Sequence, residues 1–316
     1  MRQTCLNWVH KLAKADPRVV FIGSDLSPGL LDGMKKEMPE RWFMEGIAEQ
    51  NVVGMAAGMA LEGFIPYANT IATFFTRRSY EQVAVDCCLH NVPVRLISNG
   101  GGLVYAPLGP THLAIEDMAI MRALPNMTVV ACCDAEEMKR FMDVSVDWPG
   151  PIYIRLAKGG DQVVSRPENG FVIGKAITMR KSQDKKPIVF MTTGVMTTNA
   201  LKAADMLHAA GYDSSLLHFH TVKPLDEQAV LDTAGKARLV VTVEEGIAIG
   251  GFGSAVTDVL VERLGPDMPR IKRIALPDAF CKNYGVQKDL FEIYGLEPHQ
   301  IAATVTSTLE RHRLAA

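Results

Sequence analysis

The sequence contains no long hydrophobic segment, and this absence limits what the protein can be. None of its apolar runs reaches the roughly 18–20 residues that a membrane-spanning helix requires. The first residues alternate apolar and basic side chains, without the apolar core of a signal peptide. The six cysteines form no Cys-x-x-Cys pair, which disfavours a zinc or redox centre and is typical of reduced, buried thiols. We expect a cytoplasmic protein that does not act on a membrane.

The sequence also has no large excess of positive or of negative charge. The chain has 33 basic and 35 acidic residues and a formal net charge of -2, so it offers no basic surface of the kind that binds nucleic acid. Internal repeats and low-complexity tracts are missing as well. With 316 residues, 48% of them hydrophobic, the chain is long enough to bury the cores of about two domains.

Short β-branched runs alternate with stretches of helical periodicity. The runs in the first half lie at residues 19–22, 94–97, 127–130 and 152–154. Between the last two, Asp134 precedes apolar residues that recur at i, i+3 and i+4, which predicts a capped amphipathic helix. This alternation predicts an α/β protein with parallel sheets covered by helices.

The periodic pattern weakens once, in the middle of the chain. Residues 158–186 are rich in glycine, proline and charge, and a strand followed by a helical pattern begins again near residue 187. We therefore expect a first domain over residues 1–163, a linker over 164–185 and a smaller second domain over 186–316. Both are predicted to be parallel-sheet α/β domains.

Residues 46–60, GIAEQNVVGMAAGMA, form an unusual predicted helix of small side chains. Glu49 lies in its first turn, where a carboxylate also serves the helix dipole without any catalytic role. Gly54 and Gly58 lower the stability of a helix by roughly 0.8–1 kcal/mol each relative to alanine. We expect another segment to pack very close to this helix.

This segment resembles the pyrimidine-binding segment of transketolases and of deoxyxylulose-phosphate synthases. Further segments resemble the same family in the same order, at residues 72–80, 109–117, 154–155, 221–226, 243–245 and 250–253. The resemblance covers nearly the whole chain. It implies a pyrimidine-binding domain followed by a transketolase C-terminal domain.

The resemblance implies thiamine diphosphate as the cofactor. The family glutamate, here Glu49, hydrogen-bonds the ring nitrogen N1′ of the aminopyrimidine, a task that suits a carboxyl protonated in a low-dielectric cleft. Phe74, with Phe75 and Tyr80 behind it, is expected to form the aromatic wall against the pyrimidine. Positions in the core are the alternative for these aromatics. Arg77 lies where relatives carry a second aromatic or an arginine, and we count it with the cofactor-binding residues.

The resemblance also implies a substrate site. His112, in the sequence Gly-Pro-Thr-His, resembles the imidazole that hydrogen-bonds substrate oxygens, and Arg155 resembles the arginine that holds a sugar phosphate. A salt bridge to the second domain is the alternative for Arg155. Leu108 replaces an aspartate that reads a sugar hydroxyl in typical transketolases, and Gly100 replaces a histidine. These departures predict a donor other than an ordinary pentose phosphate.

One expected segment is missing. Enzymes of this kind hold Mg²⁺ and the diphosphate on a Gly-Asp-Gly segment, and this chain has none. We therefore expect it to be the C-terminal half of a split transketolase. An N-terminal partner subunit would supply the Mg²⁺ ligands, in a heterotetramer of two chains of each kind that transfers a ketol unit between sugar phosphates.

Other functions remain open at this stage. The β subunit of a 2-oxo acid dehydrogenase shares the architecture and the glutamate, and a subunit similar to deoxyxylulose-phosphate synthase is closer still. A non-enzymatic paralogue would have lost the activating carboxylate, whereas Glu49 is present. His218 and His220 lie on one face of a predicted strand, but no third ligand is near them in the sequence, so we expect no metal site in this chain.

Overall fold

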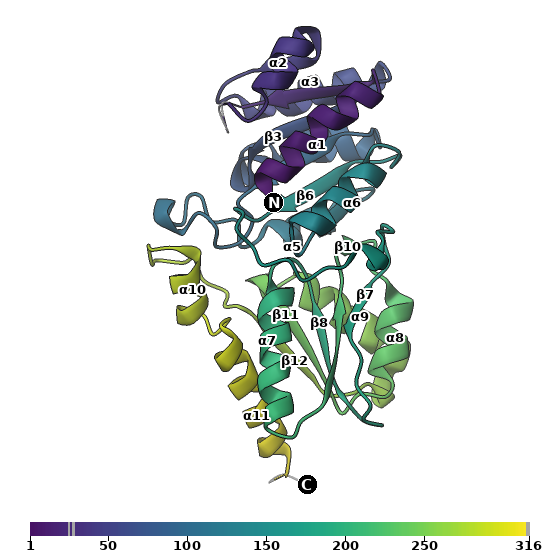
Figure 1. Cartoon of the computed structure of the whole chain (residues 1–316), viewed down its shortest axis with the longest axis vertical. Helices are drawn as coiled ribbons and strands as arrows, with labels where there is room; N and C mark the ends of the chain where they lie inside the picture. Colours follow the sequence, from purple (N-terminus) through teal and green to yellow (C-terminus); the bar gives the residue numbers. More distant parts are fainter. Residues whose placement is uncertain (25, 27–28, 314–316) are drawn as a thin grey trace.

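The computed structural model describes residues 1–24, 26 and 29–313. Two α/β units, one from each half of the chain, follow one another along the long axis (Figure 1). The prediction of two mostly parallel-sheet α/β domains is confirmed. No helix in the described part of the chain is long and apolar enough to cross a membrane.

The first sheet has seven strands in the order β10-β5-β6-β4-β3-β1-β2. Its strands from the first half of the chain pair in parallel, and their long apolar runs are buried. The edge strand β10 comes from the second half and pairs antiparallel with β5. The strands are β1 Val19–Gly23, β2 Trp42–Met44, β3 Ile65–Ile71, β4 Arg95–Asn99, β5 Thr128–Ala131, β6 Ile152–Leu156 and β10 Thr221–Lys223.

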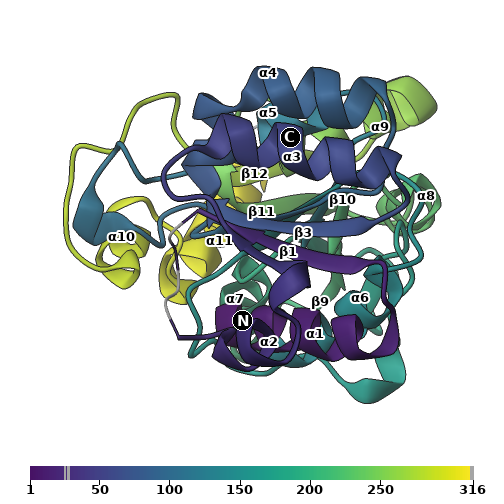
Figure 2. The ribbon, with the colours of Figure 1, turned by 90° about the horizontal axis from the view of Figure 1, so that it is seen from above.

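Helices cover both faces of this sheet (Figure 2). Helices α3, α4 and α5 lie on one face, and α1, α2 and α6 lie on the other. Asp134 caps α6 by accepting hydrogen bonds from the backbone N–H groups of Glu136 and Glu137, as its position in the sequence predicts. The helices are α1 Arg2–Ala15, α2 Asp32–Glu37, α3 Glu49–Leu61, α4 Tyr80–Gln82, α5 Asp117–Ala123 and α6 Ala135–Ser145.

The second sheet has five strands in the order β12-β11-β8-β9-β7. Helices α7 and α11 pack together, as do α8 and α9, on the two sides of the sheet (Figure 1). The strands are β7 Ile177–Arg180, β8 Ile188–Thr192, β9 Ser214–His218, β11 Leu239–Ile247 and β12 Ile271–Leu276. The helices are α7 Met196–Ala209, α8 Glu227–Ala234, α9 Phe252–Leu264, α10 Gln287–Ile293 and α11 Pro298–Arg313.

Short 3₁₀ and π-helical segments complete the secondary structure of the described residues. Two of them, Phe74–Arg78 and Val83–Leu89, are π-helical and flank α4. The others are 3₁₀ turns at Pro39–Arg41, Ala106–Leu108, Pro167–Asn169 and Gly265–Asp267.

Two segments show details that the sequence pattern does not indicate. Within the expected linker 164–185, residues 177–180 form β7, an antiparallel edge strand of the second sheet. The glycines of α3 have no close neighbour within the described part of the chain, whereas its alanines are buried in the core. A Cβ on Gly54 would meet only a carboxylate oxygen of Asp86, at 3.8 Å, and one on Gly58 would meet no atom within 4 Å.

Candidate active site

Glu49 is a buried carboxylate at the start of α3, with an exposed fraction of 1%. Its Oε1 accepts a hydrogen bond from the Thr70 hydroxyl at 3.2 Å. Thr70 in turn accepts one from Ser24 at 2.6 Å, so the proton of Thr70 is directed to Glu49. The other oxygen, Oε2, accepts a hydrogen bond from Nη1 of Arg78 at 2.6 Å. Glu49 is thus held as an acceptor on both oxygens.

Phe74 lies beside this carboxylate because the chain takes a π-helical turn after β3. The turn spans Phe74–Arg78, and the N–H of Ser79 donates to the carbonyl of Phe74 at 3.1 Å, five residues back. The guanidinium carbon of Arg78 lies 4.1 Å from the centre of the Phe74 ring, and the His112 ring lies 5.5 Å from it, edge to face. An aromatic face, a carboxylate and an imidazole therefore meet at one place. Such π-helical turns are frequent at functional sites.

The other predicted aromatics do not line this place in the same way. Phe75 is fully buried in a hydrophobic cluster to which both halves of the chain contribute, and this burial fits the core alternative. Tyr80 is half-buried, and its hydroxyl donates to the carbonyl of Ile120 at 2.9 Å. Of the three, only Phe74 contacts both His112 and the guanidinium that is bonded to Glu49.

Arg77 fastens the loop that carries His112. Its guanidinium donates to both carboxylate oxygens of Glu116, to the carbonyl of Pro110 at 3.1 Å and to the carbonyl of Leu113 at 2.9 Å. These bonds tie the π-helical turn to both sides of His112. The structure thus gives Arg77 a positioning role.

His112 is half-buried, with Nδ1 at 2.8 Å from the hydroxyl of Thr111. Burial, together with the nearby positive charges of Arg77 and Arg78, lowers the pKa of His112 below its ordinary value. The imidazole is therefore neutral at physiological pH and offers one donor and one acceptor nitrogen.

The two positions at which the sequence departs from typical transketolases lie on the same loop. Leu108 ends the short turn Ala106–Leu108 and is 48% exposed. Gly100 has φ of +75°, and a Cβ there would overlap the ring of Tyr105. A histidine cannot be accommodated at this position while Tyr105 keeps its place.

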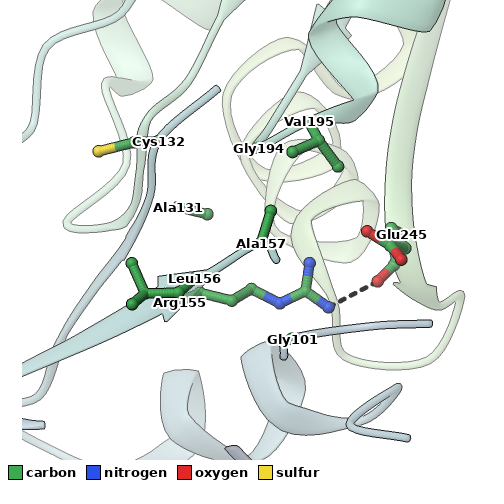
Figure 3. Close-up of a pocket in the computed structure, with 9 residues that line it drawn as sticks. All are labelled: Gly101, Ala131, Cys132, Arg155, Leu156, Ala157, Gly194, Val195 and Glu245. Atoms are coloured by element: carbon green, nitrogen blue, oxygen red, sulfur yellow. Dashed lines mark hydrogen bonds between the residues drawn. The ribbon is translucent and has the colours of Figure 1, made fainter. Parts of the chain in front are cut away.

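Arg155 lies between the two domains rather than at an exposed site (Figure 3). Its side chain is 6% exposed; Nε donates to Asp117 at 2.7 Å, and Nη2 donates to the carbonyl of Glu245 at 2.6 Å. With Gly101 and Ala157 it lines a cavity no larger than one water molecule. This geometry fits the salt-bridge alternative, because Nε and Nη2 are both engaged within the protein.

Comparison with known families agrees with this arrangement. Residues 1–160 match the family described as "Transketolase, pyrimidine binding domain", and residues 175–301 match "Transketolase, C-terminal domain". The chain belongs to the transketolase family. The pyrimidine-binding match contains Glu49, Phe74 and His112, and this family uses thiamine diphosphate.

Relatives and solved structures indicate which kind of transketolase it resembles. The chain is 33% identical to SqwH, the 6-deoxy-6-sulfo-D-fructose transketolase subunit of a Clostridium species, over 98% of this chain and 95% of that subunit. It is 36% identical to the transketolase family protein y4mN of Sinorhizobium fredii, over 95% of this chain and 86% of the relative. The 1-deoxy-D-xylulose-5-phosphate synthase of Synechococcus is 33% identical, but the match spans only 46% of that protein.

A solved structure described as "Split gene transketolase, inactive beta4 tetramer" has a TM-score of 0.88 and 33% identity, and the match covers 98% of both chains. The transketolase of Pichia stipitis shares the fold, with a TM-score of 0.82 at 18% identity over 46% of its length. This chain is therefore a transketolase subunit of the split type.

The C-terminal domain of this transketolase subunit reaches the loop that carries Leu108 and His112. Glu245, at 2% exposure, accepts hydrogen bonds on Oε1 from the backbone N–H of Leu103 at 2.7 Å and from Gln287 at 2.8 Å. Burial raises the pKa of Glu245 to about 7. The carboxyl thus connects the C-terminal domain to the base of the loop that carries His112.

This raised pKa predicts a pH-dependent contribution to stability. The folded state favours the protonated form of Glu245, so its contribution is complete below its ordinary pKa of 4.5 and is lost as the pH rises through 7. Between pH 5 and pH 8, the wild type should therefore lose roughly 2–3 kcal/mol of its free energy of unfolding relative to Glu245→Gln. Urea unfolding at each pH measures this difference, and parallel pH profiles would contradict it.

A buried polar cluster also joins the domains of the transketolase subunit. The side-chain N, O and S atoms of Cys133, Glu137 and His218 that could bind a metal lie within 4.8 Å of one another. Neither Cys133 nor Glu137 is near His218 in the sequence, but the fold brings both of them to it. Glu137 accepts from the backbone N–H of Cys133 at 2.7 Å and lies 2.9 Å from Nε2 of His218, while Thr197 holds Nδ1 of His218 at 2.8 Å. Burial and the nearby carboxylates raise the pKa of the Cys133 thiol well above its ordinary value. These hydrogen bonds make the cluster a polar contact between the two domains.

Proposed function

We propose that this chain is the pyrimidine-binding subunit of a thiamine diphosphate-dependent transketolase that moves a two-carbon ketol unit from a ketose phosphate to an aldose phosphate. The placement of the buried Glu49 carboxylate beside the Phe74 ring carries this proposal. The N-terminal partner would supply Mg²⁺ and the diphosphate site, since this sequence has no Gly-Asp-Gly. The names of its relatives, a transketolase subunit and a split-gene transketolase, support the division.

The residues present fit an aminopyrimidine ring. Such a ring needs an aromatic surface for its face and a carboxyl for its edge nitrogen, and Phe74 and Glu49 already bind a planar, nitrogen-bearing group in this manner, the guanidinium of Arg78. When bound, thiamine diphosphate would serve as the electron sink for the two-carbon fragment. Glu49 would hold a proton at the ring nitrogen, with Thr70 fixing its other oxygen.

His112 would orient the substrate. Its Nδ1 is held by Thr111, which leaves Nε2 for a substrate oxygen, and its lowered pKa keeps the ring neutral. Arg77 keeps the loop in place through Glu116. The face of α3 that carries the half-buried Gly54 and the exposed Gly58 is available for a subunit contact, and we propose a heterotetramer of two chains of each kind.

The reconstituted enzyme tests this function. The chain should be inactive alone and active in ketol transfer with a partner subunit that contains Gly-Asp-Gly, in the presence of thiamine diphosphate and Mg²⁺. Activity of the chain alone would contradict the division into subunits. Formation of a deoxyketose phosphate from pyruvate, with release of CO₂, would instead favour the alternative related to deoxyxylulose-phosphate synthase, which shares 33% identity with this chain.

We further propose that the donor differs from xylulose 5-phosphate near its reacting carbons. Leu108 cannot accept the hydrogen bond that an aspartate offers, and an unpaired buried hydroxyl costs roughly 1–3 kcal/mol. Leu108→Asp should therefore raise kcat/KM for xylulose 5-phosphate about 5–150-fold in the assembled enzyme. The name of the SqwH relative makes 6-deoxy-6-sulfo-D-fructose a suitable comparison donor, for which no gain is expected. Equal kcat/KM for xylulose 5-phosphate in both proteins would show that Leu108 does not select the donor.

A further inference from the structure

Arg78 makes both of the contacts that the proposed function assigns to the cofactor ring. Its guanidinium carbon lies 4.1 Å from the centre of the Phe74 ring, and its Nη1 donates to Oε2 of Glu49 at 2.6 Å. A guanidinium is planar and presents N–H donors along its edge, as an aminopyrimidine protonated at its ring nitrogen does. The two groups require the same aromatic face and the same carboxylate oxygen, so they cannot bind there together.

We propose that Arg78 is a competitor built into the chain, which holds the place of the aminopyrimidine and must leave when thiamine diphosphate binds. This inference rests on the proposed function. It makes Arg78 a residue that sets the affinity for the cofactor, since the observed Kd is the intrinsic Kd divided by the fraction of molecules in which Arg78 has moved away.

The burial of Glu49 explains why such a placeholder is needed. A carboxylate with an exposed fraction of 1% is costly without a partner, and Thr70 supplies only one neutral hydrogen bond, at 3.2 Å. Arg78 supplies the compensating charge before the cofactor arrives. Once a protonated ring nitrogen takes over this hydrogen bond, Arg78 is no longer required at Glu49.

Arg78 is held by fewer contacts than its neighbour Arg77, so its side chain can move more easily. Arg77 is held by both carboxylate oxygens of Glu116 and by the carbonyls of Pro110 and Leu113. The side chain of Arg78 is 41% exposed, and the ion pair with Glu49 is at its tip. Rotation of its long stem toward solvent would release Glu49 without disturbing the loop that Arg77 fastens.

Binding of thiamine diphosphate and Mg²⁺ to the assembled two-subunit enzyme, measured by isothermal titration calorimetry, tests the proposal without any turnover. Arg78→Ala should lower the Kd for thiamine diphosphate at least fivefold. Arg78→Lys keeps a charge for Glu49 but loses the planar face on Phe74, so its Kd should lie between those of the wild type and Arg78→Ala.

Chemical rescue supplies a readout that a merely structural role of Arg78 would not change. In Arg78→Ala, guanidinium ion at about 20 mM should bind between Phe74 and Glu49 and raise the Kd for thiamine diphosphate toward that of the wild type. Urea, which has the same shape but no charge, should not change this Kd. If Arg78→Ala folds poorly, guanidinium should restore its thermal stability and urea should not.

The outcomes separate this inference from the proposed function. A wild type that binds the cofactor, with Arg78→Ala binding equally or more weakly, would overturn the role of Arg78 and leave the proposed function in place. Failure of the wild type and of both variants to bind thiamine diphosphate would overturn the proposed function, and this inference with it. Tighter binding by Arg78→Ala that guanidinium reverses would support both.

Discussion

Replacing Glu49 by glutamine should lower the turnover of the assembled enzyme by about 10²–10⁴-fold, the range typical of a lost general acid–base group. Glutamine has the same shape and keeps one oxygen that can accept the hydrogen bond from Arg78, while its amide N–H group can donate to the hydroxyl oxygen of Thr70. Folding and assembly should therefore be nearly unchanged. What the amide lacks is an acidic proton that it can share with the ring nitrogen of the cofactor.

Steady-state kinetics with the reconstituted enzyme measure this effect, with circular dichroism and mass measurement to verify folding and assembly. Glu62→Gln, at the other end of the same helix, is a matched control, because Glu62 is exposed and lies far from the Glu49 carboxylate along α3. It should leave turnover unchanged. A loss of only a few-fold in Glu49→Gln would show that Glu49 serves the helix start and not the reaction.

Much of the fold could be predicted because its signals are local. Apolar runs such as residues 94–97 and 152–154 are strands buried within the first sheet, where neighbours cover both faces. Asp134 caps its helix through backbone groups only two and three residues away. Glu49 likewise occupies the helix start that the pattern of residues 46–60 indicates.

The features that could not be predicted depend on contacts between distant segments or on a small shift in helical register. Strand β10 joins the first sheet although it belongs to the second half of the chain, and no local pattern shows this pairing. The π-helical turn places one more residue in the turn than an α-helix does, so that Arg78, and not Arg77, reaches Glu49.

Loss of the Arg155 side chain should be among the most destabilising single substitutions in this protein. Asp117 has an exposed fraction of 0%, and its Oδ2 accepts hydrogen bonds from Arg155 at 2.7 Å and from Tyr153 at 2.9 Å. Arg155→Met would leave this carboxylate without a counter-charge, which typically costs 3–5 kcal/mol for a buried pair. The contact with the carbonyl of Glu245 would also be lost, and with it a link between the domains.

Urea unfolding of the full chain measures this loss, and two further variants identify its cause. Asp117→Asn removes the buried charge, so the double variant with Arg155→Met should recover a large part of the stability that the single variant loses. Arg263→Met breaks an exposed pair with Glu227 and should cost at most about 1 kcal/mol. Unchanged stability of Arg155→Met would contradict the structural role, and a raised KM for the ketose phosphate would indicate a phosphate-binding role. Stability thus reports the structural role and KM reports the phosphate-binding role. A guanidinium held by Asp117 and by the carbonyl of Glu245 stabilises the protein whether or not substrate is present.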